Sequence, residues 1–162
     1  MIESLPSSLA QVRIDTGGHG DLDAVVSIMD LAFDDRFGEA WTRSQCAGIL
    51  PMPGVTLTLA RKSSGEPVGF ALQRIIAGDG ELLLLAVNPG HRRQGIGRQL
   101  LRNFIKAAER EGSDRVHLEV REGNPAVVMY RLAGFKIVGR RRKYYNGRTG
   151  GQFDALTLAL NI

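Results

Sequence analysis

"VNPGHRRQGIG", residues 87–97, joins an apolar run, ELLLLAV (81–87), to a stretch with helical periodicity, RQLLRNFIKAAEREG (98–112). Two glycines, Gly95 and Gly97, therefore stand where the helix is expected to begin. Glycine inside a helix costs up to about 1 kcal/mol relative to alanine, so the two residues need a physical reason. A strand, a tight basic loop and a helix N-terminus can together bind phosphate, because the first N–H groups of a helix lack partners and carry partial positive charge.

The residue types around the two glycines suit this interpretation. Without side chains, Gly95 and Gly97 would let a pyrophosphate approach the backbone N–H groups closely. Arg92 and Arg93 would add guanidinium groups, whose geometry matches phosphate oxygens. The spacing is neither that of a P-loop nor the three-glycine dinucleotide fingerprint. Taken alone, the two glycines favour a plain, tight connection between strand and helix.

The composition is that of an ordinary globular protein. A chain of 162 residues, 43% apolar and 23% charged, predicts one domain over residues 1–162, with residues 1–12 as a flexible N-terminal arm. No apolar run approaches the roughly 20 residues of a membrane span, and the N-terminus has no secretory pattern. The single cysteine, Cys46, and three scattered histidines predict neither a disulfide nor a metal site. A cytoplasmic protein is the simplest interpretation.

Positive charge is concentrated in two parts of the chain, although the net charge is only +4. The group around the glycines consists of Arg92, Arg93, Arg98, Arg102 and Lys106, and the C-terminal group consists of Arg131, Lys136, Arg140, Arg141, Arg142, Lys143 and Arg148. Groups of basic residues such as these usually form solvent-exposed faces. The alternative is that they bind partners: a polyanionic ligand near the glycines, and an acidic or nucleic-acid-rich partner near the C-terminus. Only Tyr144 and Tyr145 interrupt the basic run, so direct nucleic-acid binding is not expected.

Hydrophobic periodicity predicts a mixed α/β order of elements. A helix is expected over residues 21–33 with Asp21 as its N-cap, and a short one after Thr42. Residues 55–62, 68–76 and 81–87 predict three antiparallel strands joined by short turns. The remaining predictions are a long helix that ends at Gly112, a strand over 115–120, a helix over 125–134 that starts with Pro125, and strands over 135–145 and 154–160.

With these elements in order, the loop 87–97 resembles the acetyl-CoA signature of the GNAT N-acetyltransferase superfamily, Arg/Gln-x-x-Gly-x-Gly/Ala. Arg92, Gly95 and Gly97 fill its fixed positions. The likeness runs from about residue 14 to residue 160 and is strongest over residues 81–160. There, LEVREGNPAVVMYRLAGFKIVGRRRKYY (118–145) and DALTLAL (154–160) are similar to the ribosomal-protein-alanine N-acetyltransferases, which acetylate the α-amine of a protein N-terminus.

The resemblance implies a fold and a binding mode for acetyl-CoA. It implies a single GNAT-like domain with a mostly antiparallel sheet, flanked by helices and splayed open between ELLLLAV and RVHLEV. The pantetheine arm would bond to the backbone of residues 85–87 like an added strand, and the pyrophosphate would lie on the loop 92–97. The residues it assigns to acetyl-CoA are Leu85, Ala86, Val87, Arg92, Arg93, Gln94, Gly95, Ile96, Gly97, Arg98, Asn124 and Tyr130.

Two residues are candidates for proton transfer. Glu119, the predicted base, lies on the polar side of RVHLEV; its alternative is a plain solvent-facing position. Tyr130, the predicted acid, would donate a proton to the departing thiolate; its alternative is a core tyrosine. Asn124 would hold the cofactor arm by its amide, or else cap the helix that begins at Pro125.

Two departures from the family pattern affect the site. GNPA (123–126) has glycine in place of the usual serine and is one residue shorter, which could alter the spacing of Glu119 and Tyr130. Trp41 and Thr42 only approximate the family's tryptophan–serine pair. The leading hypothesis is therefore acetylation of a protein N-terminus, such as that of a ribosomal protein, by a monomer or homodimer. The alternatives are a small-molecule amine or internal lysine as acceptor, and a non-catalytic CoA-binding module.

Overall fold

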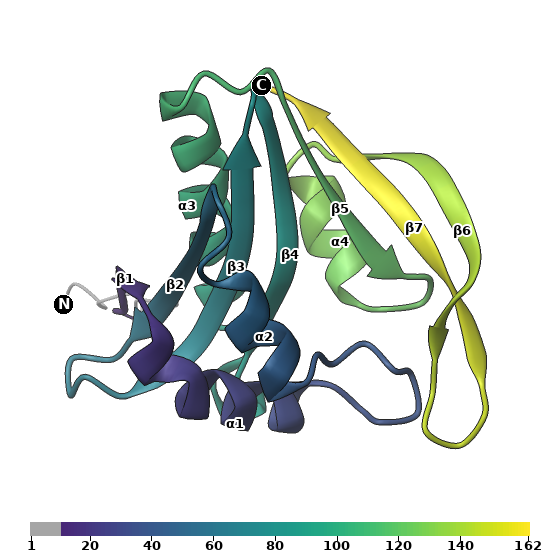
Figure 1. Ribbon diagram of the computed structural model, residues 1–162, viewed down its shortest axis with the longest axis horizontal. Helices are drawn as coiled ribbons and strands as arrows, with labels where there is room; N and C mark the ends of the chain where they lie inside the picture. The colour runs from purple at the N-terminus through teal and green to yellow at the C-terminus, as the bar shows by residue number, and fades with distance from the viewer. Residues whose placement is uncertain (1–10) are drawn as a thin grey trace, which may run out of the picture.

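A seven-stranded sheet with helices on both faces forms the fold of the computed structural model, which describes residues 11–162 (Figure 1). The strand order is β1-β2-β3-β4-β5-β7-β6. The strands are β1 (Arg13–Gly17), β2 (Val55–Arg61), β3 (Pro67–Ile76), β4 (Asp79–Val87), β5 (Arg115–Arg121), β6 (Lys136–Asn146) and β7 (Gln152–Asn161). The helices are α1 (Leu22–Ala32), α2 (Arg43–Ile49), α3 (Ile96–Arg110) and α4 (Ala126–Leu132), with short 3-10 turns η1 (His19–Asp21) and η2 (Pro89–His91).

The predicted antiparallel meander is confirmed, since β2, β3 and β4 pair in sequence order. The strand β1, which pairs antiparallel with β2, was not predicted from the sequence. Its five residues, RIDTG, carry only one large apolar side chain and are all partly exposed, so their hydrophobic pattern is too weak to indicate a strand.

The sheet opens between β4 and β5, as the resemblance implied. The two strands pair in parallel only over Asp79–Leu82 and Arg115–Leu118. Beyond these residues β4 continues to Val87 and β5 continues to Arg121, but the two strands no longer pair with each other and diverge (Figure 1). The edge of β4 that faces β5 is therefore unpaired over residues 83–87, where its backbone groups are available to a ligand.

The core lies in two layers, one on each face of the sheet. The first packs α3 and α4 against the sheet and includes Phe104, Leu118 and Tyr130. The second packs α1 and α2 and includes Met29 and Phe70. The register of β3 with β4 shifts between Leu72 and Gln73, which lets Leu82 join the first layer while Leu84 and Ala86 join the second. This irregularity turns the strand at the point where the sheet opens.

Local signals at the helix ends were mostly right. Thr42 begins α2 with a capping box to Gln45, as its position suggested. Asp21 is the N-cap residue of α1, as predicted, but its side chain makes no cap hydrogen bond: its carboxylate accepts a hydrogen bond from Gly18 N (2.9 Å) and pairs with Arg61 (2.9 Å). A cation on a neighbouring strand thus competes successfully with the local cap.

Val12 packs against the core, whereas residues 1–10 of the expected N-terminal arm lie outside the described residues. Across residues 11–162, no helix is long and apolar enough to cross a membrane.

Candidate active site

A cavity of about 130 Å³ lies where β4 and β5 diverge. Residues of β4, β5, α4 and the α1–α2 loop line it, together with Tyr144 and Tyr145 of β6. Glu119, Tyr130, Asn124 and Leu85 all contribute to its wall, so the fold brings the two predicted proton-transfer residues into one space. The short GNPA segment therefore still permits both side chains to reach the same cavity.

Tyr130 is held rigidly in a largely apolar setting. It is 6% exposed, belongs to the core cluster on the α3 side, and packs edge-to-face on Phe135 with ring centroids 6.0 Å apart. Burial, and secondarily the negative charge of Glu39, raises the pKa of the Tyr130 phenol well above its usual value. Tyr130 is therefore both a core residue and a cavity residue. Its ring packs in the core, and its phenol lies at the cavity wall and stays protonated.

Glu119 occupies the polar side of β5. Val116, Leu118 and Val120 alternate into the core, which places Glu119 on the opposite face. Thr157 Oγ1 of the paired strand β7 donates to its two carboxylate oxygens at 3.1 and 3.0 Å, and Arg141 Nε lies 3.1 Å from Oε1. With its side chain only 18% exposed, this carboxylate is oriented by its partners and does not move freely in solvent.

Asn124 uses both ends of its amide. Its Oδ1 accepts a hydrogen bond from Ala126 N (2.9 Å), the first residue of α4, so the side chain does cap the first turn, although the N-cap position itself belongs to Pro125. Its Nδ2 donates to Glu39 Oε1 at 2.8 Å. The contact of Asn124 with the cofactor arm stays a prediction, and in it the arm and Glu39 would both have to bind the same side-chain amide.

Glu39 and Arg121 form a buried pair that the sequence did not predict. Glu39 Oε1 lies 3.2 Å from Arg121 Nε, and both side chains are 9% exposed. The Arg121 guanidinium also lies over the Phe37 ring, 3.7 Å from its centroid. The pair ties the α1–α2 loop to the end of β5 beside the cavity. No local spacing could indicate it, because the two residues come from distant parts of the chain.

Removal of Glu39 should destabilise the protein strongly. Glu39→Ala leaves the buried Arg121 guanidinium without its counter-charge, and we expect a loss of about 3 kcal/mol in the free energy of unfolding. Urea denaturation followed by circular dichroism measures this loss. Glu66→Ala, which removes a solvent-exposed partner of Lys62, is the matched control and should cost less than about 1 kcal/mol. Equal effects of the two variants would contradict a structural role for the buried pair.

The loop between β4 and α3 has the backbone that its glycines suggested. Gly95 is the N-cap of α3 with φ 75°, and Arg93 also has a positive φ of 61°. A side chain at Gly97 would place its Cβ 3.3 Å from Met129 Sδ, so this glycine allows α3 and α4 to approach closely. The phosphate roles of Gly95 and Gly97 remain predictions, to which the structure adds a packing role for Gly97.

The other residues predicted to bind acetyl-CoA differ in what they can offer. Arg92 Nη2 donates to the carbonyl of Ala32 at 3.0 Å, which links the loop to the end of α1. Ile96 is buried in the core, so only its backbone can face a ligand. The residues whose positions on the loop or the open strand edge stay consistent with the prediction are Leu85, Ala86, Val87, Arg93, Gln94 and Arg98.

Alanine substitutions at two helix-associated glycines should differ in their effect on the stability of the protein. Gly95→Ala forces a Cβ into the left-handed region and should cost about 1 kcal/mol of stability. Gly48→Ala lies within α2, where an added Cβ meets no atom within 4 Å, and should be neutral or stabilising by up to about 1 kcal/mol. Thermal denaturation compares the two variants. A Gly95→Ala protein as stable as the wild type would show that the loop does not require the left-handed conformation.

Comparison with known proteins points in one direction. The sequence model of the acetyltransferase (GNAT) family matches residues 22–135. The [ribosomal protein bS18]-alanine N-acetyltransferase of Escherichia coli K12 is 37% identical over 100 residues, which cover 61% of this chain and 67% of that one. The N-alpha-acetyltransferase RimI of Mycobacterium tuberculosis is 41% identical over 102 residues, with 60% and 61% covered. The crystal structure of the ribosomal-protein-S18-alanine N-acetyltransferase from Escherichia coli superposes with a TM-score of 0.82 and 29% identity over 94% of both chains.

Proposed function

Because this chain belongs to the acetyltransferase (GNAT) family, it is an acetyl-CoA-dependent N-acetyltransferase, and we propose that it acetylates the α-amine of a protein N-terminus. The observation that carries the proposal is the cavity that holds Glu119 and Tyr130 together at the opening of the sheet. Relatives that act on the N-terminal alanine of a ribosomal protein make such a protein the first acceptor to test.

An α-amine needs little help from a base to become a nucleophile. The reaction needs a neutral nitrogen, and an α-amine with a pKa near 8 is already partly neutral near pH 7. A lysine amine, with a pKa near 10.4, is neutral in only about one molecule in 2,500 at that pH. Glu119 needs only to accept one proton, directly or through water, which is within the capacity of a carboxylate.

In the proposed reaction the amine nitrogen bonds to the acetyl carbonyl carbon and the C–S bond breaks. Glu119 accepts the proton that the amine loses. The Tyr130 phenol donates its proton to the departing sulfur, and its raised pKa means that the phenol is protonated before the reaction starts. The two residues are then restored by one net proton transfer from Glu119 to Tyr130 through solvent.

The opened sheet provides the place for acetyl-CoA. The backbone of Leu85, Ala86 and Val87 pairs with β3 on one side only, so its other edge can bond to an extended pantetheine arm. Backbone N–H groups of the loop 93–97 and the α3 N-terminus would receive the pyrophosphate, with Arg93 and Arg98 close by in the chain. These contacts are part of the proposal.

The acceptor class can be tested with three peptides and labelled acetyl-CoA. They are an alanine-initiated peptide with the N-terminal sequence of a ribosomal protein, the same peptide with a blocked N-terminus and one lysine, and a peptide with both amines blocked. We expect transfer to the first only. Transfer to the lysine peptide alone, or only to small amines, would overturn the proposal. Tight acetyl-CoA binding without any transfer would instead indicate a non-catalytic module.

The remaining predictions concern the protein's surroundings. A cytoplasmic location is proposed because ribosomal proteins are made there. A monomer or homodimer, and the lack of nucleic-acid binding, remain predictions that sedimentation and gel-shift measurements can test.

A further inference from the structure

Three carboxylates, those of Glu39, Glu81 and Glu119, line the cavity where the sheet opens. Each is paired with an arginine from another element, and the pairs are Glu39 with Arg121 (3.2 Å), Glu81 with Arg74 (2.6 Å) and Glu119 with Arg141 (3.1 Å). An arginine has only N–H donors and no acceptor, so it favours the ionised carboxylate. Ion pairing therefore does not distinguish the one carboxylate that has to gain and lose a proton from the two that do not.

Glu119 differs from the other two carboxylates because it has a hydroxyl partner. Across residues 11–162, Thr157 Oγ1 is the only hydroxyl that bonds to any of the three, and it lies 3.1 and 3.0 Å from the two Glu119 oxygens. The second partner of Glu39 is Asn124 Nδ2, which can only donate. We propose that Thr157 is a positioning residue, whose hydroxyl orients the Glu119 carboxylate and remains its partner when the carboxylate takes up a proton. The inference rests on the proposed function, because Thr157 acts through the base assigned there.

The pairing of the strands places this hydroxyl at the carboxylate. Glu119 of β5 and Thr157 of β7 are directly opposite each other in the antiparallel register, and their hydrogen bonds show that both side chains lie on the same face. On the other side of β7, Gly139 of β6 is opposite Thr157. Glycine has no side chain to compete for the hydroxyl, so this row of three residues leaves the Thr157 hydroxyl directed to Glu119.

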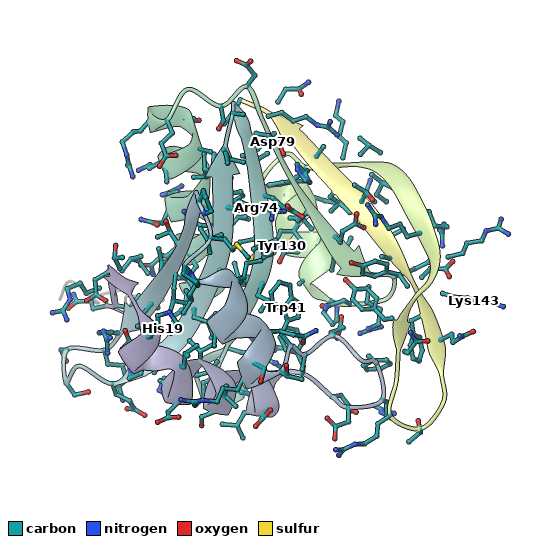
Figure 2. The ribbon with its side chains drawn as sticks, viewed as in Figure 1. His19, Trp41, Arg74, Asp79, Tyr130 and Lys143 are labelled. Carbon is teal, nitrogen blue, oxygen red and sulfur yellow. The ribbon has the colours of Figure 1, made fainter. Side chains whose placement is uncertain are left out.

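Arg141, the charged partner of Glu119, is held less firmly. Its side chain is 62% exposed, and water screens an ion pair of this kind. Its guanidinium also lies 5.6 Å from the centroid of the Tyr144 ring. Figure 2 shows Lys143 of the same strand extending outward from the edge of the sheet, towards solvent. Arg141 can therefore turn to solvent when Glu119 becomes neutral, whereas strand pairing keeps Thr157 in place.

The β6–β7 hairpin that carries Thr157 is also tied to the α1–α2 loop. Phe37 packs edge-to-face on Phe153, with ring centroids 5.2 Å apart. Arg148 donates to Asp35 twice, from its backbone N to the carbonyl (3.0 Å) and from Nη1 to the carboxylate (3.0 Å). These contacts restrain the hairpin on which the positioning hydroxyl lies, as precise orientation of a reacting group requires.

The chemistry of a hydroxyl suits both protonation states of the base. Before the reaction, Thr157 donates its hydrogen to the ionised carboxylate of Glu119. Once Glu119 has accepted the proton of the amine, it is a carboxylic acid that can donate, and the Thr157 oxygen can accept that hydrogen bond. Thr157 itself neither gains nor loses a proton. A partner that only donates would lose its hydrogen bond to the protonated oxygen.

Substitutions at residue 157 test the inference. Thr157→Val keeps the branched shape and suits a strand, but it removes the hydroxyl. With the best α-amine peptide we expect kcat to fall about tenfold, the effect of about one hydrogen bond, while KM and the Kd for acetyl-CoA stay within about twofold. Thr157→Ala, a second variant without the hydroxyl, should show the same loss of kcat. Thr157→Ser restores the hydroxyl and should return kcat to within about threefold of the wild type.

A double-mutant cycle shows whether Thr157 acts through Glu119. In the Glu119→Gln background there is no base to orient, so adding Thr157→Val should lower kcat by less than about twofold further. Thr58→Val is the matched control, because Thr58 is a buried threonine of β2 whose hydroxyl donates to the carbonyl of Ala71 (3.5 Å), away from the cavity. Its kcat should equal that of the wild type.

The outcomes separate this inference from the proposed function. If the wild type acetylates the peptide but the variants without the hydroxyl keep the wild-type kcat, or Thr157→Ser does not restore it, the positioning role is wrong and the proposed function stands. The same conclusion follows if Thr157→Val causes its full loss in the Glu119→Gln background. If no α-amine is acetylated, both the inference and the proposed function are wrong.

Discussion

Tyr130→Phe is expected to lower kcat about 100-fold or more while the protein stays folded. The substitution removes only the phenolic oxygen, and general acid catalysis is worth about 10²–10⁴-fold. The ring keeps its packing on Phe135 and its place in the core, so the melting temperature should change little. Steady-state kinetics with the best α-amine peptide, together with thermal denaturation, measures both effects.

Two further measurements test whether Tyr130 acts as the general acid. The Kd for acetyl-CoA, measured by calorimetry, should remain within about twofold, because the phenol acts on the departing sulfur and not on ground-state binding. Since burial raises the pKa of Tyr130, the wild-type kcat should not decline up to about pH 10 through loss of this proton. A Tyr130→Phe variant with an unchanged kcat would remove the acid assignment.

Glu119→Gln is expected to reduce kcat/KM about 100-fold, and most strongly at low pH. The amide has nearly the same shape and can still accept the hydrogen bond from Thr157, but it cannot take a proton from the amine. As pH rises towards 9, a growing fraction of the acceptor is already neutral and the defect should shrink. Rate measurements from pH 6 to pH 9 with one α-amine peptide show whether this occurs.

Glu122→Gln provides the matched control for Glu119. Glu122 directly follows β5 and is half-exposed, with an ion pair to Arg140 outside the cavity. Its substitution should leave both kcat and the pH profile as in the wild type. A similar loss in both variants would show that general surface charge, and not proton transfer by Glu119, sets the rate.

Much of this fold could be read from the sequence because its local patterns are strong. The alternation in RVHLEV placed Val116, Leu118 and Val120 in the core, and the glycine at 112 ends α3 with φ 80°. The opening of the sheet came from the resemblance alone, because no periodicity reveals where two parallel strands part. The structure places Glu119 and Tyr130 at one cavity, as the two proposed proton transfers require.

The features that the sequence did not predict depend on contacts between distant segments. Glu39 lies in an irregular loop without periodicity, and its partners Arg121 and Asn124 are more than 80 residues away. The cavity exists only once β4, β5, α4 and the α1–α2 loop are brought together. Asp21 shows a mixed case: the local signal correctly placed the N-cap of α1, but the carboxylate pairs with Arg61 of a distant strand and makes no cap hydrogen bond.

The contact between the α1–α2 loop and the β6–β7 hairpin has a consequence for chain topology. An α-amine terminates its chain, so the polypeptide leaves the reaction centre in one direction and needs one channel. The chain that carries an internal lysine continues in two directions, so both of its arms would have to leave the reaction centre. Phe37 on Phe153 and Asp35 with Arg148 join the loop to the hairpin beside the cavity, an arrangement that would favour the single exit of a chain end over the two exits of a chain interior.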